Sequence, residues 1–184
     1  MKETMDMVEQ SLRKLDRWVI DHEYRGYEPF DGLSSVLRPL TFRNALAERI
    51  LQQAVRQIPV NLRPLFGVKP LDSTKGRGYM AWGYLTLLQV RDDDLYRQRA
   101  IDCLTWLIEN KSPFYQDYSW GNHFDYSSRG GQMPKHEPTI VWTSHIAILR
   151  GDMEYYMVMY GGSLMLQGLT SLLGFAGEAG SMTT

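Results

Sequence analysis

The sequence has a single cysteine and no excess of either charge, and both features narrow the classes of protein it can encode. Because Cys103 stands alone among 184 residues, no internal disulfide can form, and an inert buried thiol is the expected state. The formal net charge of -1 argues against a dedicated nucleic-acid-binding protein, which would carry a basic face. The N-terminus lacks an apolar signal core, so we expect a cytoplasmic location.

Familiar cofactor and metal motifs are also missing. The segment Lys75-Gly-Arg-Gly78 has too few glycines for a phosphate loop, and no dinucleotide, zinc or nucleophile-elbow fingerprint occurs. His123, Asp125 and His145 are metal-ligand types without a tight ligand spacing. We therefore expect neither a metal nor a cofactor.

Five stretches carry apolar residues at helical spacing, and no strand pattern of comparable strength is present. The expected helices cover residues 3–22, from an N-cap at Thr41 to before Pro59, 75–91, 94–110, and onward from about Thr139. Asp92, Asp93 and Asp94 precede the fourth helix, where capping is a better explanation than metal binding. The second helix has an apolar stripe made of Leu46, Ile50, Leu51, Ala54 and Val55.

Three long loops separate these helices, at 23–40, 59–74 and 111–138. If the helices pair antiparallel, the loops 59–74 and 111–138 lie at one end of the array. The 23–40 loop starts from the other end and is long enough to run back, since extended chain covers about 3.3 Å per residue. The expected fold is therefore all-α, with antiparallel hairpins and long loops gathered at one end.

The composition changes after Arg150. Residues 155–176 contain no charged side chain but several glycines. A buried helix, a membrane span and a sequence that no longer belongs to the fold are the alternatives. Polar residues such as Gln167 weaken the membrane alternative, and no Lys or Arg follows. We expect a domain over 1–150, a separate apolar segment over 151–184, and a helix buried or poorly packed on a shortened domain.

The loop from Trp120 to Thr139 is rich in aromatic, acidic and basic side chains. Loops of this composition between rigid elements are common places for binding and catalysis. Asp125 in this loop and Asp31 in the 23–40 loop each follow a phenylalanine. Two carboxylates facing one cleft are able to act as acid and base on a glycosidic bond, with His123 as a proton carrier. Turn capping or pairing with a nearby arginine is the alternative for each aspartate.

Anion-binding groups and aromatic rings accompany these acids. Arg63, Arg129 and Lys135 are candidates for holding a carboxylate or phosphate, and surface solvation or ion pairing with local acids is the alternative. Trp120 is a candidate for stacking on a sugar ring, and core packing is its alternative. His145 is a candidate substrate-binding residue on the fifth helix, where a structural role is also common.

Four segments in this order resemble a known family: Tyr27–Ser35, Pro59–Val68, Trp120–Arg129 and Pro134–Ser144. They look like the successive loop motifs of bacterial proteins associated with polysaccharide biosynthesis, which are similar to the α/α-toroid, six-hairpin-glycosidase-like superfamily. The resemblance covers about residues 20–148 and implies a toroid of helical hairpins with its cleft at one end. Six hairpins need about twice this length, so an N-terminal fragment with a partial toroid is expected.

Three functions are consistent with these features. The first is a carbohydrate-active protein that acts on or binds an acidic or phosphorylated saccharide by hydrolysis, elimination or epimerisation. The second is a non-catalytic helical-repeat module that recognises a protein or glycan, and the third is an inactive truncated product. A saccharide is the expected partner, nucleic acid and membrane are not expected, and the oligomeric state stays open.

Overall fold

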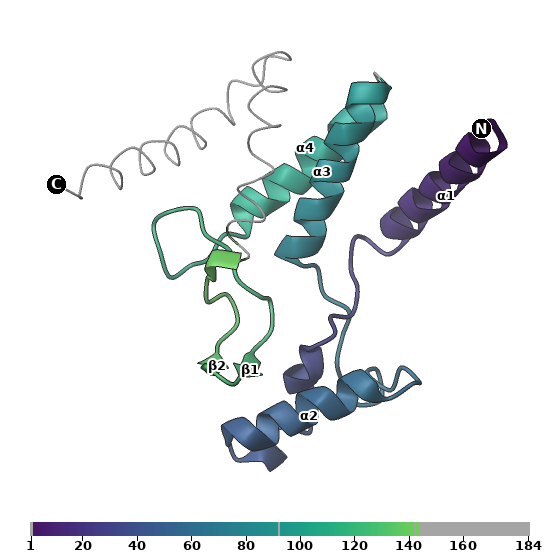
Figure 1. The fold of residues 1–184 in the computed structure, drawn as a ribbon. Helices are drawn as coiled ribbons and strands as arrows, with labels where there is room; N and C mark the ends of the chain where they lie inside the picture. Colours follow the sequence, from purple (N-terminus) through teal and green to yellow (C-terminus); the bar gives the residue numbers. More distant parts are fainter. Residues whose placement is uncertain (1, 92, 142, 144–184) are drawn as a thin grey trace. The chain divides into compact units, whose positions relative to one another are not determined.

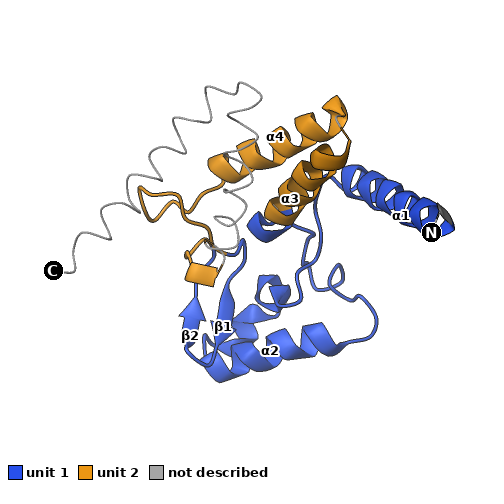
Figure 2. Cartoon of the chain, turned by 45° about the horizontal axis from the view of Figure 1, so that its top comes forward, with its two compact units in different colours: residues 1–76, 122–135 blue, residues 77–121, 136–184 orange. Residues whose placement is uncertain are grey.

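The computed structural model describes residues 2–91, 93–141 and 143 (Figure 1). Within these residues the chain is mostly helical. It contains the α-helices α1 (Lys2–Asp21), α2 (Ala45–Gln57), α3 (Thr74–Val90) and α4 (Asp94–Glu109), the 3-10 helices η1 (Asp31–Ser34) and η2 (Arg38–Thr41), and the strands β1 (Tyr126–Ser128) and β2 (Gly131–Met133). The described chain divides into two compact units (Figure 2), and the predicted segment 151–184 lies outside the described residues.

Unit 1 comprises residues 1–76 and 122–135. Its centre is α2, on which η1, η2 and β1 pack. Gly32 permits the approach of η1, because a Cβ at this position would lie 3.0 Å from the Gln52 Cα atom and 3.2 Å from the Val55 Cβ atom. In Figures 1 and 2 the β1–β2 hairpin lies beside α2. Unit 1 is therefore held together by segments distant in sequence.

The second helix differs from its prediction at its start and on its buried face. Thr41 ends η2, and Asn44 is the N-cap, with its side-chain oxygen accepting hydrogen bonds from two backbone N–H groups of the first turn. Glu48, Gln52 and Val55 are buried. In contrast, Leu46 and Ile50 are 59% and 62% exposed, so the predicted apolar stripe is only partly the packed face.

The β1–β2 hairpin is the element that the sequence did not predict. Its strands are antiparallel, with Ser127 opposite Gln132. Each strand has three residues, and Tyr-Ser-Ser and Gly-Gln-Met have no clear apolar alternation. The signal that sequence periodicity needs is therefore absent, and the 111–138 segment is not a simple loop.

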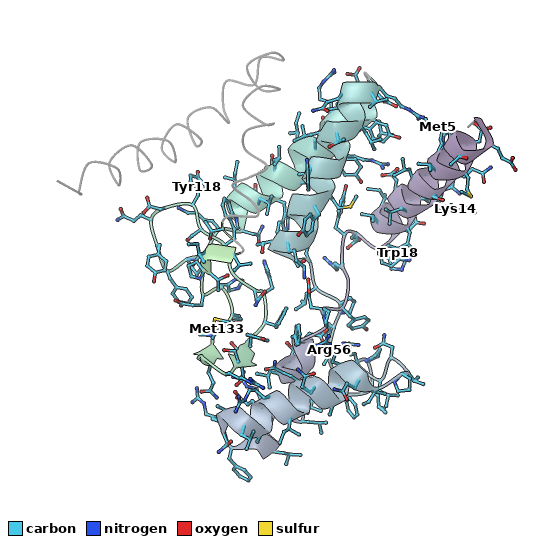
Figure 3. The ribbon with its side chains drawn as sticks, viewed as in Figure 1. Met5, Lys14, Trp18, Arg56, Tyr118 and Met133 are labelled. Carbon is cyan, nitrogen blue, oxygen red and sulfur yellow. The ribbon has the colours of Figure 1, made fainter. Side chains whose placement is uncertain are left out.

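Helix α1 confirms the first predicted helix to within one residue at each end. Several of its apolar residues, including Met5, Leu15 and Trp18, are more than half exposed, whereas Val19 is buried. Figure 3 labels Met5 and Trp18 together with Lys14, and side chains project from all around this helix. No described helix combines the length and apolar character that crossing a bilayer requires.

Unit 2 comprises residues 77–121 and 136–184, of which 136–141 and 143 are described beyond residue 121. Helix α4 begins after its N-cap Asp93, which confirms capping by this aspartate. Helices α3 and α4 pack together, and the rings of Tyr84 and Tyr96 stack with centroids 6.2 Å apart. The buried residues of unit 2 include Ala81, Tyr84, Leu85, Ala100, Cys103, Leu104, Leu107 and Trp120.

The fifth predicted helix falls mostly outside the described residues. Ile140, Val141 and Thr143 are helical, which agrees with a start near Thr139. Gly121 pairs with Pro138 in an isolated β-bridge just before this start. A Cβ at Gly121 would lie 2.2 Å from the Glu137 carbonyl oxygen, so only glycine fits at this position.

Candidate functional site

Asp125 lines a cavity in unit 1 with a volume of about 610 Å³. The cavity lies among η1, η2, α2 and the β1–β2 hairpin, and Met133, labelled in Figure 3, is part of its wall. Its charged lining residues are two arginines, Arg38 and Arg43, and two acids, Glu48 and Asp125. The sequence predicted only Asp125 of these four.

The Arg38 guanidinium connects the two acids of the cavity. Its Nη1 donates a hydrogen bond to Asp125 Oδ2, and its Nε lies 3.5 Å from Glu48 Oε1. Asp125 Oδ1 accepts a hydrogen bond of 2.8 Å from the Lys135 backbone N–H. Both oxygens of Asp125 are therefore held, and the two acids share one cation.

Glu48 is the buried member of this group, with 1% of the residue exposed. Its Oε2 accepts a hydrogen bond of 2.6 Å from Gln132 Nε2, which also donates to the Arg43 backbone oxygen at 3.0 Å. Gln132 belongs to β2, so the hairpin helps to position Glu48. Helical spacing hides this role in the sequence, because a lone glutamate in an amphipathic helix normally faces solvent.

Arg43 lines the cavity from an unusual backbone conformation. Phe42 and Arg43 have φ angles of 50° and 58°, so two consecutive residues other than glycine adopt the left-handed region. This conformation costs on the order of 1 kcal/mol or more per residue and is concentrated at functional positions. No hydrogen bond or ion pair engages the Arg43 guanidinium within the described residues. Arg43 can therefore receive an anion.

Asp31 and Arg63, which were predicted as acid and anion ligand, bind each other. Asp31 is 3% exposed, and its Oδ1 accepts a hydrogen bond of 2.8 Å from Arg63 Nε. Asp31 Oδ2 accepts one of 3.1 Å from the Glu28 backbone N–H, and Arg63 Nη2 donates to the Glu28 carbonyl oxygen at 3.3 Å. The pairing alternative therefore describes both residues, and neither lines the Asp125 cavity.

The environment of Asp31 also changes its acidity. Burial raises the pKa of this carboxyl above its ordinary value of 3.8, because the loss of solvation outweighs the lowering effects of the Arg63 hydrogen bond and charge. The Asp31–Arg63 pair joins the 23–40 and 59–74 loops. The same loops also meet through the Gly26–Leu71 β-bridge. This pair is a structural clamp in unit 1.

Trp120 lies in unit 2 and is only 5% exposed. Its indole Nε1 donates a hydrogen bond of 2.8 Å to the Leu107 carbonyl oxygen. The Thr139 backbone N–H donates to the Trp120 carbonyl oxygen at 3.3 Å. A ring buried to this extent has no free face for a sugar, so the stacking role does not fit and core packing does.

The other candidates are dispersed. Arg129 is exposed in the turn between β1 and β2, and it lines a second cavity of about 610 Å³ along α2. Lys135 is exposed and reaches Asp125 through its backbone. His123 belongs to unit 1 and is half-buried, but it is not a lining residue of the Asp125 cavity. His145 lies outside the described residues.

The described residues contain no group of three or more His, Cys, Asp or Glu side chains that could hold a metal ion. No family model, curated protein or solved structure matches the chain. The candidate site is therefore defined by the cavity of Arg38, Arg43, Glu48 and Asp125.

Proposed function

We propose that this chain binds an acidic or phosphorylated saccharide in the Asp125 cavity, and that it has the fold of a partial α/α toroid. The observation that carries the binding proposal is the Arg43 guanidinium, which lines a cavity together with a second arginine and two carboxylates. A guanidinium binds the carboxylate of a uronic acid or a phosphate through parallel hydrogen bonds. Carboxylates accept hydrogen bonds from sugar hydroxyl groups. The cavity thus offers partners for both parts of an acidic sugar.

Two carboxylates close to one guanidinium also match the arrangement that glycoside chemistry needs. Acid and base in glycosidases lie about 5 to 9.5 Å apart. Asp125 and Glu48 both pair with Arg38, and this shared partner supports the proposal that their carboxyl groups act together. Asp125 is the acid/base candidate retained from the sequence. The family resemblance of the loop motifs supports the same class of ligand, with hydrolysis, elimination and epimerisation as possible reactions.

Binding without turnover is the second candidate, and one observation favours it. Asp125 Oδ2 accepts from Arg38, and Oδ1 accepts from the Lys135 backbone N–H. A carboxylate whose two oxygens are both engaged by the protein has fewer lone pairs free to reach a proton of the substrate. A non-catalytic saccharide-binding module uses the same cavity and leaves the bonds of its ligand intact.

Calorimetric titration of the full chain tests the proposal. The probes are methyl β-D-glucuronide, glucose 6-phosphate and, as the neutral comparison, glucose. We expect tighter binding of the acidic probes and a loss of about tenfold or more for Arg43→Gln, since hydrogen bonds to charged groups contribute about 1.5–3 kcal/mol. Arg25→Gln removes an exposed arginine of unit 1 and serves as the matched control.

Equal affinity for glucose and the acidic probes, or an unchanged affinity in Arg43→Gln, contradicts the proposal. Mass spectrometry of a glucuronic-acid oligosaccharide after incubation separates the two candidates. New products that disappear with Asp125→Asn indicate an enzyme. Binding without products indicates the module.

A further inference from the structure

One face of α1 carries a row of exposed apolar side chains, which begins at Met5, labelled in Figure 3. The row, called here the α1 stripe, consists of Met5, Val8, Leu12 and Leu15. Residues three and four positions apart lie on the same face of a helix, so these side chains form one continuous surface. Each of the four residues is between 41% and 67% exposed. The next position in the series, Val19, is buried, so the chain itself covers only that end of the face.

The exposed stripe leaves α1 without its main source of stability. A helix of this length in water depends more on the packing of its apolar face than on intrinsic helix propensity. Within α1, Arg13 Nη2 lies 2.7 Å from Glu9 Oε1. An exposed ion pair one turn apart contributes little to helix stability. A partner that covers the α1 stripe therefore supplies the stabilisation that the helix lacks.

The charges of α1 indicate which partner fits. Between residues 3 and 10 every charged residue is an acid, namely Glu3, Asp6 and Glu9. Between residues 11 and 17 three of the four charged residues are bases, namely Arg13, Lys14 and Arg17, and Asp16 is the exception. A second copy of α1 in the antiparallel direction places each acidic half beside a basic half, whereas a parallel copy aligns like charges. Charge complementarity therefore selects an antiparallel second copy.

The spacing of the α1 stripe fits the same arrangement. In an antiparallel pair centred between Val8 and Leu12, these two residues lie opposite each other, and Met5 lies opposite Leu15 of the second copy. Each contact then occurs twice, as the two-fold symmetry of a closed dimer requires. Apolar residues spaced three and four apart on two such helices interdigitate along the shared seam. All four residues of the stripe are thereby covered.

We propose that α1 is a dimerisation helix that pairs antiparallel with α1 of a second copy through the α1 stripe. A membrane surface is the other common partner of an amphipathic helix, and helices that bind it are rich in Lys and Arg on their polar face. In α1 the first half of the polar face carries Glu3, Asp6 and Glu9, which anionic lipid headgroups repel. The second copy matches both the charges and the stripe.

Sedimentation equilibrium of the full chain tests the proposal. Wild type is expected to show a monomer–dimer equilibrium. Leu12→Glu, which places a charge at the centre of the seam in both copies, is expected to weaken association by about a hundredfold. Met7→Glu makes the same change at an exposed apolar residue outside the stripe and should dimerise as wild type does. A wild type that stays monomeric at all accessible concentrations, or a Leu12→Glu variant that dimerises normally, overturns the proposal.

Cross-linking with a short bismaleimide tests the orientation and keeps the proposal falsifiable if Leu12→Glu fails to fold. A mixture of Met5→Cys and Leu15→Cys is expected to give a covalent dimer with one chain of each kind. Met5→Cys alone should cross-link poorly, because equal positions lie about 15 Å apart along the axes of an antiparallel pair. Wild type, whose Cys103 is buried, provides the background. A dimer of Met5→Cys with itself, or none from the mixture, contradicts antiparallel pairing.

Vesicles of phosphatidylcholine and phosphatidylserine in equal parts distinguish the lipid alternative. The proposed dimer predicts that wild type does not sediment with these vesicles, because the α1 stripe is covered by the second copy. Sedimentation of wild type with the vesicles that Leu12→Glu abolishes and Met7→Glu retains assigns the stripe to lipid and overturns the proposal.

Discussion

The Gln52 side-chain amide hydrogen-bonds both backbone groups of Ser127. Its Oε1 accepts from the Ser127 N–H at 2.7 Å, and its Nε2 donates to the Ser127 carbonyl oxygen at 3.4 Å. Both residues are buried, so the amide of a helix residue takes the place of a neighbouring strand. A hairpin of two three-residue strands is too short to be stable alone, and this pairing attaches it to α2.

Replacing Gln52 by leucine is therefore expected to lower the free energy of unfolding by about 1–3 kcal/mol, because the backbone groups of Ser127 remain buried without partners. Urea unfolding followed by circular dichroism measures the change. Gln53→Leu at the exposed neighbouring position is the control. If the two variants have the same stability, the Gln52 amide does not anchor the hairpin.

The Asp31–Arg63 clamp is expected to show strong coupling in a double-mutant cycle. Arg63→Gln leaves the Asp31 carboxylate buried without its cation. We expect this substitution to lower the free energy of unfolding by about 3–5 kcal/mol. Adding Asp31→Asn removes the stranded charge, so the double variant should lose less than the sum of the two single variants. The exposed pair Glu23–Arg25, cycled as a control, should couple by less than about 1 kcal/mol. Additive single effects at Asp31 and Arg63 contradict the clamp.

The raised pKa of Asp31 predicts a specific dependence of stability on pH. Because the folded-state pKa lies above the ordinary value of 3.8, the folded protein binds the proton more readily than the unfolded chain does. The stability that this group contributes is complete below about pH 3.8 and is lost as the pH rises through the folded-state pKa. Wild type should thus gain stability relative to Asp31→Asn as the pH falls from 7 towards 4. The urea midpoints of both proteins are measured over this range, and a wild-type midpoint that falls relative to that of Asp31→Asn on acidification excludes a raised pKa.

Trp120→Phe separates packing from saccharide binding. The variant lacks the indole N–H that donates to the Leu107 carbonyl oxygen. We expect its free energy of unfolding to be lower by about 1–3 kcal/mol. Glucuronide affinity should stay within experimental error of wild type. Trp82→Phe, at a residue that is 44% exposed on α3, is the control for the chemical change. A stable Trp120→Phe protein with weakened glucuronide binding restores the stacking role.

The helices were predictable because their information is local. The periodicity of α1, α3 and α4 and the aspartate before α4 placed these elements to within one or two residues. The predicted N-cap of α2 was wrong because Thr41 and Asn44 are both good capping residues, and Thr41 is the last residue of η2, where its hydroxyl group donates to the Arg38 carbonyl oxygen.

The cavity was not predictable from local patterns, because its contacts join residues far apart in the chain. Asp125 and Arg38 are 87 positions apart, and Gln132 and Glu48 are 84. Composition marked the 120–139 segment as rich in functional residue types, and this led to Asp125. Nothing in the sequence indicates which arginine it meets. The pairing of Arg63 with Asp31 was not predictable for the same reason, since the two residues are 32 positions apart.

Glu48 and Gln52 lie one turn apart on α2, and this spacing links two properties of the protein. A residue and its fourth neighbour occupy the same face of a helix, so the group that faces the cavity and the group that anchors the hairpin share one orientation. Any insertion or deletion in the first two turns of α2 rotates Glu48 and Gln52 together or separates them. In related sequences, positions 48 and 52 should therefore vary jointly, with their spacing kept even where the surrounding apolar residues drift.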